Sequence, residues 1–176
     1  MPIILDRSPF AEHPSEVAFL TERVSIRADQ IIIWLTLSLK RVTSPNPSVV
    51  PFPVILDTGH SHTFSLHERH LIEWAGLRPE VLTILGAVRE RGQRILLREV
   101  NLWAHPTAKG SRDQLADRPA HQLAAPRGIA VYPGAEFPRL PILGLRVIAE
   151  NELVLKVDGK RRKVTLRTPR RWWPFS

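Results

Sequence analysis

The sequence contains no cysteine, and this absence limits the possible chemistry before any motif is considered. Without a thiol the chain forms no disulfide, has no cysteine nucleophile and holds no cysteine-ligated zinc. No apolar run approaches the roughly 20 residues that a membrane-spanning helix needs, so we expect no membrane span. Residues 1–5 hold only three large aliphatic side chains before Asp6, too few for a signal-peptide core. We therefore expect a cytoplasmic protein.

The composition is that of one folded domain. The chain has 176 residues, of which 43% are hydrophobic and 24% charged, and it shows no internal repeat or long biased tract. A chain of this length and composition can bury a proper core. The net charge of +8 comes from arginine, since 20 Arg stand against 5 Lys. Such charge can recruit nucleic acid or an acidic surface, and it is equally typical of an ordinary solvated surface.

Strand patterns dominate the first third of the chain and predict an all-β fold. Residues 1–16 are polar and interrupted by proline, and we expect them to form an N-terminal arm along the surface. Residues 17–27 and 30–42 are rich in β-branched and other apolar side chains, and the second run alternates along its length. Four prolines in residues 43–53 exclude a strand there, because proline donates no hydrogen bond to a sheet.

The most informative stretch is a short apolar run that stops abruptly on a carboxylate. Residues 54–56 are Val, Ile and Leu, which is typical of a buried strand, and Asp57, Thr58 and Gly59 follow. A carboxyl group at the end of a buried strand is a candidate acid or base. Gly59 allows the backbone to turn tightly and to approach whatever Asp57 faces. An ordinary turn after a strand is the structural alternative.

Residues 56–61, Leu-Asp-Thr-Gly-His-Ser, resemble the active-site loop of aspartic proteases, which has apolar residues, Asp-Thr-Gly, any residue and then Ser or Asp. The resemblance implies that Asp57 is catalytic. It also implies that Thr58 locks two such loops together, that Gly59 leaves room for the substrate backbone, and that Ser61 hydrogen-bonds near the carboxylate.

A second stretch, Leu-Pro-Ile-Leu-Gly-Leu at residues 140–145, resembles the apolar-apolar-Gly element that these proteases place later in each lobe. In that family Ile142, Leu143 and Gly144 would pack against the Asp loop, and a short helix would follow. Residues 145–149, with Asn151 as a helix end, supply one. Because Asp-Thr-Gly occurs only once, the resemblance is to the single-lobed, retropepsin-like aspartic proteases, over residues 19–168.

The family resemblance implies a closed barrel with one or two short helices. Residues 17–168 would form the protease domain. Within it, residues 104–126 have neither a strand nor a helix period, and we expect an inserted loop there. Residues 169–176 form a basic aromatic C-terminal tail, for which dimer contact, disorder and nucleic-acid binding are the alternatives, in that order.

A long hairpin is predicted after the Asp loop. Residues 81–88 and 93–103 read as its strands, and its charged tip holds Arg89, Glu90, Arg91 and Gly92. In the family the hairpin at this place in the order is the flap that closes over substrate. The alternative is a solvent-exposed turn.

Four histidines, His60, His62, His67 and His70, invite a metal hypothesis because their spacing can bring pairs of imidazoles onto one ion. The spacing of His67 and His70 lacks one residue of the His-Glu-x-x-His zinc-protease helix. We favour surface histidines, with His60 tuning the charge near Asp57. The family resemblance implies neither a metal nor an organic cofactor.

The sequence therefore predicts an aspartic endopeptidase that acts on a peptide or protein substrate as a homodimer, with one Asp57 from each chain. Two adjacent carboxyl groups cannot both ionise, so the pair shares a proton and activates a water molecule. Two alternatives remain: a non-catalytic binding or dimerisation module on the same scaffold, and a basic nucleic-acid adaptor. Nucleic acid is the less favoured partner.

Overall fold

The structure, a computed structural model, describes residues 2–134 and 137–169. Strands hold 45% of the chain and helices 9%, which confirms the all-β class and the two short helices. The strands are β1 Ile3–Pro9, β2 Ser15–Phe19, β3 Glu22–Ile26, β4 Ile31–Ser38, β5 Phe52–Asp57, β6 Phe64–His67, β7 Ile84–Glu90, β8 Gln93–Arg98, β9 Asn101–His105, β10 His121–Leu123, β11 Ile129–Tyr132, β12 Ile142–Gly144, β13 Val154–Asp158 and β14 Lys163–Arg167. The helices are α1 Glu68–Glu73, α2 Leu145–Glu150 and a single 3-10 turn at Pro79–Val81.

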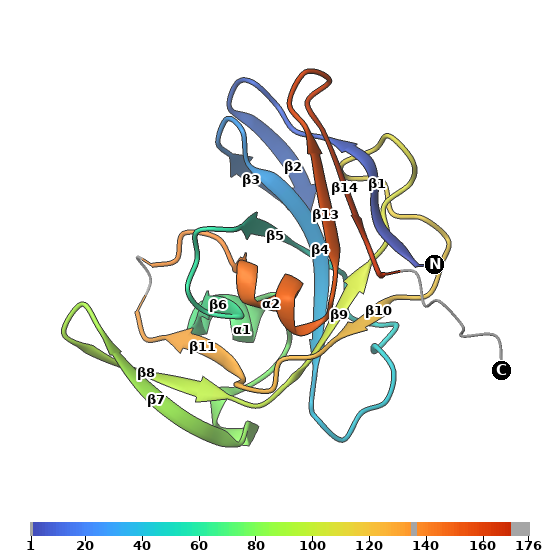
Figure 1. The fold of residues 1–176 in the computed structure, drawn as a ribbon. Coiled ribbons are helices and arrows are strands. Elements are labelled where there is room, and N and C mark those ends of the chain that lie inside the picture. The colour runs from blue at the N-terminus through green and yellow to red at the C-terminus, as the bar shows by residue number, and fades with distance from the viewer. Residues whose placement is uncertain (1, 135–136, 170–176) are drawn as a thin grey trace, which may run out of the picture.

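The expected closed barrel is wrong for the described residues. Nine strands form one open sheet in the order β10-β9-β4-β5-β12-β6-β11-β8-β7, and β1-β14-β13 and β2-β3 form two smaller sheets. The β7–β8 hairpin extends away from the other strands (Figure 1). β7 and β10 are the two edges of this sheet and do not pair with each other in the described part of the chain, and none of the residues of β7 is fully buried.

The centre of the large sheet brings together strands that are far apart in the sequence. β12 lies between β5 and β6, parallel to β5 and antiparallel to β6. The register pairs Ile142 with Ile55 and Gly144 with Asp57. β12, which follows much later in the chain, thus lies directly beside the end of β5.

The hydrophobic core forms the base on which this end of β5 is held. Seven of the eight residues of β4 and the first five of β5 are buried. Each fully buried large aliphatic or aromatic side chain contributes about 1.5–3 kcal/mol to folding. Fully buried examples around the centre are Ile33, Leu35, Phe52, Val54, Phe64, Leu66, Leu71, Leu143 and Val147.

The N-terminal segment is a paired strand rather than the surface arm expected at residues 1–16. β1 pairs antiparallel with β14, and the two strands lie side by side in Figure 1. Ile4 and Leu5 are fully buried in the core, and β2 begins at Ser15. The short aliphatic run at the start of the chain covers the edge of β14, which would otherwise expose unpaired backbone groups.

The inserted loop expected at residues 104–126 carries more structure than predicted. It contains the end of β9, the three-residue strand β10 and an isolated bridge between Thr107 and Leu115. A three-residue strand is too short to show a period in the sequence. The predicted basic aromatic tail at residues 169–176 lies outside the described residues apart from Pro169. In the part of the chain that is described, no helix combines the length and hydropathy needed to cross a membrane.

Candidate functional site

Asp57 is the last residue of β5, at the point where the buried strand reaches the surface. The five residues before it are buried, whereas Asp57, Thr58 and Gly59 are exposed. The Gly59 N–H donates a hydrogen bond of 2.8 Å to Asp57 Oδ1. A Cβ at Gly59 would lie 3.3 Å from the same oxygen, a tight contact that glycine avoids. The turn therefore orients the carboxylate through the backbone.

Gly144 of β12 is pressed against the loop that follows Asp57. Its N–H donates a hydrogen bond of 3.0 Å to the carbonyl of Thr63. A Cβ at this position would lie 2.0 Å from the carbonyl oxygen of His62 and 2.8 Å from that of His60. These atoms belong to the backbone and cannot rotate away, so only glycine fits here. Leu143 beside it is fully buried.

We expect Gly144→Ala to destabilise the fold by about 3 kcal/mol, at the upper end of the range for overpacking, because the added methyl group meets fixed carbonyl oxygens. The free energy of unfolding in urea measures the effect. Gly86→Ala in β7 is the matched control, since a Cβ there meets nothing within 4 Å. Equal midpoints for the two variants would contradict the close contact.

Within one chain, Thr58 and Ser61 do not make the contacts expected of them, which were a contact between paired loops for Thr58 and a hydrogen bond near the carboxylate for Ser61. Neither side chain makes a hydrogen bond to any of the residues that the structure describes. Ser61 instead lines a separate cavity together with His62 and Arg127. The contact between paired loops that the family resemblance assigns to Thr58 requires a second chain, and its exposed position leaves it free for one.

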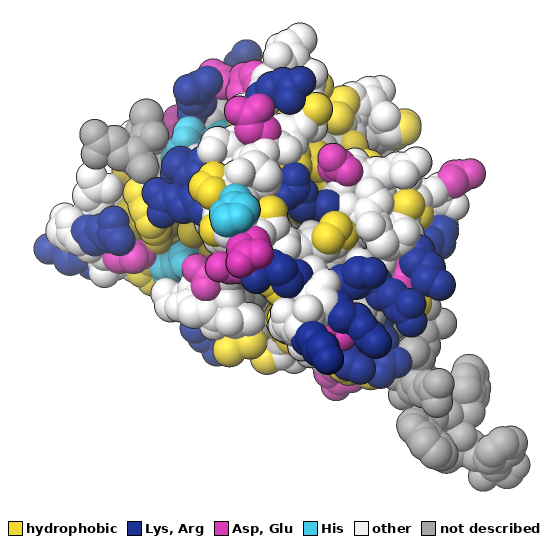
Figure 2. All heavy atoms as spheres, turned by 90° about the horizontal axis from the view of Figure 1, so that it is seen from above, with side chains coloured by type: hydrophobic (Ala, Val, Ile, Leu, Met, Phe, Trp, Pro, Cys, Tyr) yellow, Lys and Arg dark blue, Asp and Glu magenta, His cyan; other side chains and the backbone are white. Residues whose placement is uncertain are grey.

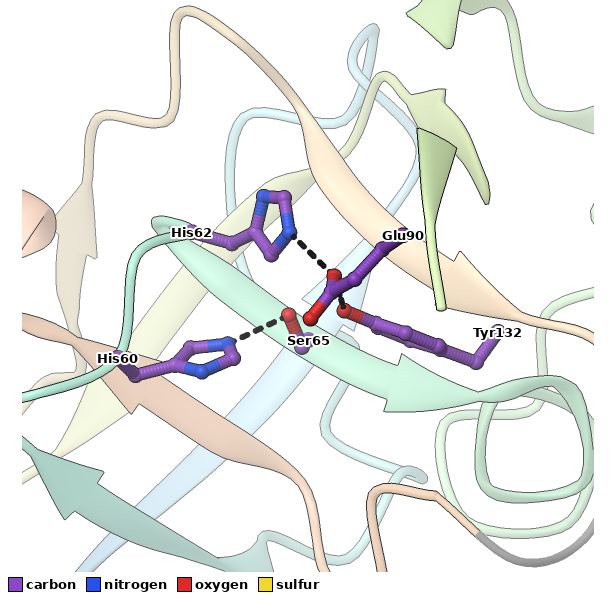
Figure 3. A network of polar contacts seen from close by, with 5 residues as sticks. All are labelled: His60, His62, Ser65, Glu90 and Tyr132. Carbon is purple, nitrogen blue, oxygen red and sulfur yellow. Dashed lines mark hydrogen bonds and ion pairs between the residues drawn. The ribbon is translucent and has the colours of Figure 1, made fainter. Parts of the chain in front are cut away.

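A polar network adjoins the Asp57 loop and ties three elements together (Figure 3). His62 Nε2 lies 3.2 Å from Glu90 Oε2, and the Tyr132 hydroxyl donates a hydrogen bond of 2.5 Å to the same oxygen. His60 Nε2 lies 2.7 Å from Ser65 Oγ. The network thus joins the loop after Asp57, the end of β7 and the end of β11.

The protonation states of this network follow from burial and from the hydrogen bonds. The Tyr132 hydroxyl, followed by His62, lowers the pKa of Glu90. Burial, with the Glu90 carboxylate, raises the pKa of Tyr132. Burial and neighbouring His62 lower the pKa of His60, while Asp57 and Glu90 oppose them. At neutral pH the network therefore holds an ionised Glu90, a neutral Tyr132 and a neutral His60.

Tyr132→Phe should lower the free energy of unfolding by about 1.5–3 kcal/mol at neutral pH, since it removes a hydrogen bond to a charged acceptor. The pKa of Glu90 in the folded protein lies below its unfolded value, so this stabilisation is complete above the unfolded pKa of about 4.3 and is lost as the pH falls through the folded pKa. Urea denaturation at neutral and at strongly acidic pH should show the difference from wild type shrinking in acid. A difference that is the same at both pH values would contradict the role of ionised Glu90.

The predicted flap is a hairpin, but its tip is shorter than predicted. Arg89 and Glu90 belong to β7 and pair with Arg94 and Gln93. The turn itself is Arg91-Gly92, with φ of 50° and 78°, the two positive values that a type I′ hairpin turn requires. This correction matters because Glu90, as a strand residue, turns its side chain toward His62 and Tyr132 instead of toward solvent.

Two cavities flank the site. One of about 330 Å³ lies beside Asp57, and one of about 460 Å³ lies under the hairpin tip. Phe137 lines both, and Arg91 stacks on its ring at 4.4 Å. Asp57 therefore lines one cavity, and Phe137 lies between it and the cavity at the hairpin tip. The first cavity is lined by Arg27, Gln30, Ile55, Asp57, Phe137, Arg139, Leu140 and Ile142.

The four histidines fall into two separate pairs. His60 and His62 lie in the loop beside Asp57, whereas His67 and His70 are buried, with their rings stacked at 3.8 Å. Burial lowers the pKa of His70 to about 3. The surface position expected for this second pair is wrong. No group of three or more potential metal ligands occurs among residues 2–134 and 137–169.

The sequence did not indicate the residues that other segments bring to this region. Arg27 and Arg139 line the cavity beside Asp57, and Tyr132 hydrogen-bonds to Glu90 in the polar network. They come from three segments with no shared motif, so no local signal identifies them. A comparison with protein-family models and with curated proteins finds no match to the chain.

Proposed function

We propose that the chain is one half of an aspartic endopeptidase that hydrolyses peptide bonds as a homodimer. The observation that carries this proposal is the insertion of β12 between β5 and β6, which sets Gly144 beside Asp57 at the mouth of a cavity. Both motifs that resemble the retropepsin-like proteases thus meet at one place. The proposed chemistry depends on the Asp57 loop and on β12, which supports it, and not on a closed barrel.

The surface position of Asp57 supports a site that two chains complete together. Asp57, Thr58 and Gly59 form an exposed turn on a rigid base. A two-fold axis through this turn would bring the same residues of both chains together. One carboxylate of the pair is then ionised and accepts a proton from the attacking water. The other is neutral and donates its proton toward the carbonyl oxygen of the peptide.

The hairpin supplies the second wall of the substrate groove in this proposal. The tip of the β7–β8 hairpin lines the neighbouring cavity and contacts Phe137, which also lines the Asp57 cavity, through Arg91. The bond between Glu90 and His62 anchors the end of β7, next to the hairpin tip, to the Asp57 loop. A peptide in the groove would lie extended between this hairpin and Asp57, where both would partly shield it from solvent.

The test is digestion of a mixture of unfolded proteins by the purified chain, from acidic to neutral pH. New amino termini identified by mass spectrometry would support the proposal if they disappear with Asp57→Asn. Binding of peptides without cleavage by the wild-type protein would favour the binding module, in which Asp57 merely closes a turn through Gly59.

The nucleic-acid adaptor is less well supported by the charge distribution. On the face seen in Figure 2, Lys and Arg side chains are interspersed with Asp and Glu over most of the surface, and they gather most densely toward the lower right. Binding to nucleic acid would weaken steeply with added salt, whereas hydrolysis of an uncharged peptide should not. The salt dependence therefore separates these two functions.

A further inference from the structure

The cavity beside Asp57 carries more positive than negative charge. Arg27, in the turn between β3 and β4, and Arg139, just before β12, both line it. Asp57 is the only acidic side chain among the described lining residues. Among the described lining residues, two positive charges therefore face one negative charge, and this balance favours an anion.

Arg139 is held at the cavity by a hydrogen bond to another element. Its Nη1 donates a hydrogen bond of 2.8 Å to the carbonyl of Ser25 in β3. This bond joins the segment before β12 to β3 and orients the Arg139 guanidinium without a ligand. The backbone N–H of Arg27 donates a hydrogen bond of 2.9 Å to Gln30 Oε1, which closes the turn that carries Arg27.

The arginines lack a partner of opposite charge in the described residues. Ion pairs there involve other basic side chains, among them Arg23 and Arg69, but neither Arg27 nor Arg139. Burial, followed by the charge of Arg27, lowers the pKa of Arg139, so the two cations are close enough to repel each other. An anion between them would relieve this repulsion and form charge-assisted hydrogen bonds.

The remaining walls of the cavity fit the stem of a side chain rather than a free ion. Ile55, Leu140 and Ile142 are apolar, and Ile55 pairs with Ile142 two positions before the pair formed by Asp57 and Gly144. The cavity therefore combines apolar residues from the paired strands β5 and β12 with two guanidinium groups. A short aliphatic stem with an anionic head matches both kinds of lining residue.

We infer that this cavity is a substrate subsite that selects a glutamate or aspartate side chain on the residue next to the peptide bond that is hydrolysed at Asp57. The inference rests on the function proposed above and adds a substrate class to it. The bidentate geometry of arginine suits a carboxylate, so Arg27 and Arg139 would determine specificity without taking part in the hydrolysis itself.

The test uses two peptides that differ only by Glu or Gln at this position, with kcat/KM measured for each. Wild type should prefer the Glu peptide on the order of tenfold, which corresponds to about 1.4 kcal/mol. Arg27→Gln and Arg139→Gln should each move the ratio toward one, and added salt should do the same. Arg27→Lys should retain part of the preference, because it keeps the charge but loses the bidentate geometry. Equal rates on the two peptides in wild type would overturn the inference while leaving the protease function intact.

Two controls distinguish recognition by this cavity from an effect of the overall charge of the protein and from recognition of a peptide C-terminus. Arg161→Gln removes an exposed arginine in the turn between β13 and β14 and should leave the Glu to Gln ratio unchanged. A third peptide ends at the same position and is tested in two forms, one with a free C-terminal carboxylate and one with a C-terminal amide. A preference that follows the free terminus instead of the internal Glu side chain would overturn the inference.

If no peptide is hydrolysed, measurements of peptide binding test whether the cavity is an acidic subsite. Calorimetry with the wild-type protein should then show tighter binding of the Glu peptide than of the Gln peptide, and Arg139→Gln should abolish the difference. That result would uphold the acidic subsite although the proposed hydrolysis fails. Equal affinity for both peptides would overturn the subsite as well.

Discussion

Replacing Asp57 by asparagine should lower the rate of peptide hydrolysis by about 10²–10⁴-fold, the range that loss of general acid–base catalysis causes. Asparagine keeps the size of the side chain and still accepts a hydrogen bond from the Gly59 N–H. It cannot exchange a proton with water and substrate. Release of new amino termini from a defined peptide measures the loss.

The fold should survive this substitution, because Asp57 is exposed and its side chain makes one hydrogen bond among the described residues. An unchanged urea midpoint would show this. Asp113→Asn is the matched control, since Asp113 is also an exposed aspartate of a loop but lines a different cavity. Residual cleavage near the wild-type rate in purified Asp57→Asn protein would remove the protease assignment.

Elements with a local signal could be predicted from the sequence. The apolar run before Asp57 is the buried part of β5, and the apolar residues after Gly144 form α2 with Asn151 as its C-cap. The Asp-Gly pair at residues 158–159, flanked by alternating apolar residues, is typical of a hairpin turn, and the turn between β13 and β14 spans residues 159–162. In each case the determining residues lie within a few positions of one another.

The pairing of the two ends of the chain could not be predicted in this way. β1 joins β14 with Ile3 opposite Arg167, and the register shifts twice along the pair. Arg7 adopts a φ of 52°, which breaks the alternation that would identify a strand. Tertiary contact with the core therefore outweighs the weak local preference of this segment.

The candidate site was predictable only where the motifs lie. The sequence placed Asp57 at the end of a strand and indicated a close approach by Gly144. It did not indicate that Glu90 turns inward, because charged residues at a hairpin tip are ordinarily solvated. The orientation of Glu90 is set by Tyr132 and His62, which approach it only in the folded chain.

The proposed homodimer makes activity depend on protein concentration. An isolated chain has one Asp57, so it lacks the second carboxyl group that shares the proton and half of the groove. Specific activity should therefore fall on dilution, along the dimer dissociation curve measured by analytical ultracentrifugation. Constant specific activity at concentrations where the protein sediments as a monomer would contradict the mechanism.

Mixing provides the sharper form of this test. If wild-type chains exchange with a ninefold excess of Asp57→Asn chains, random pairing leaves about a tenth of the wild-type chains with a wild-type partner, so the activity should fall to roughly a tenth. Asp113→Asn chains added at the same excess should not poison the activity, because they supply an intact Asp57 to each mixed pair. A loss that occurs with both variants would reflect aggregation or dilution rather than a shared site. No loss with Asp57→Asn, under conditions in which chain exchange is demonstrated, would show that each chain acts alone and that the partner of the Asp57 carboxyl group lies within the same chain.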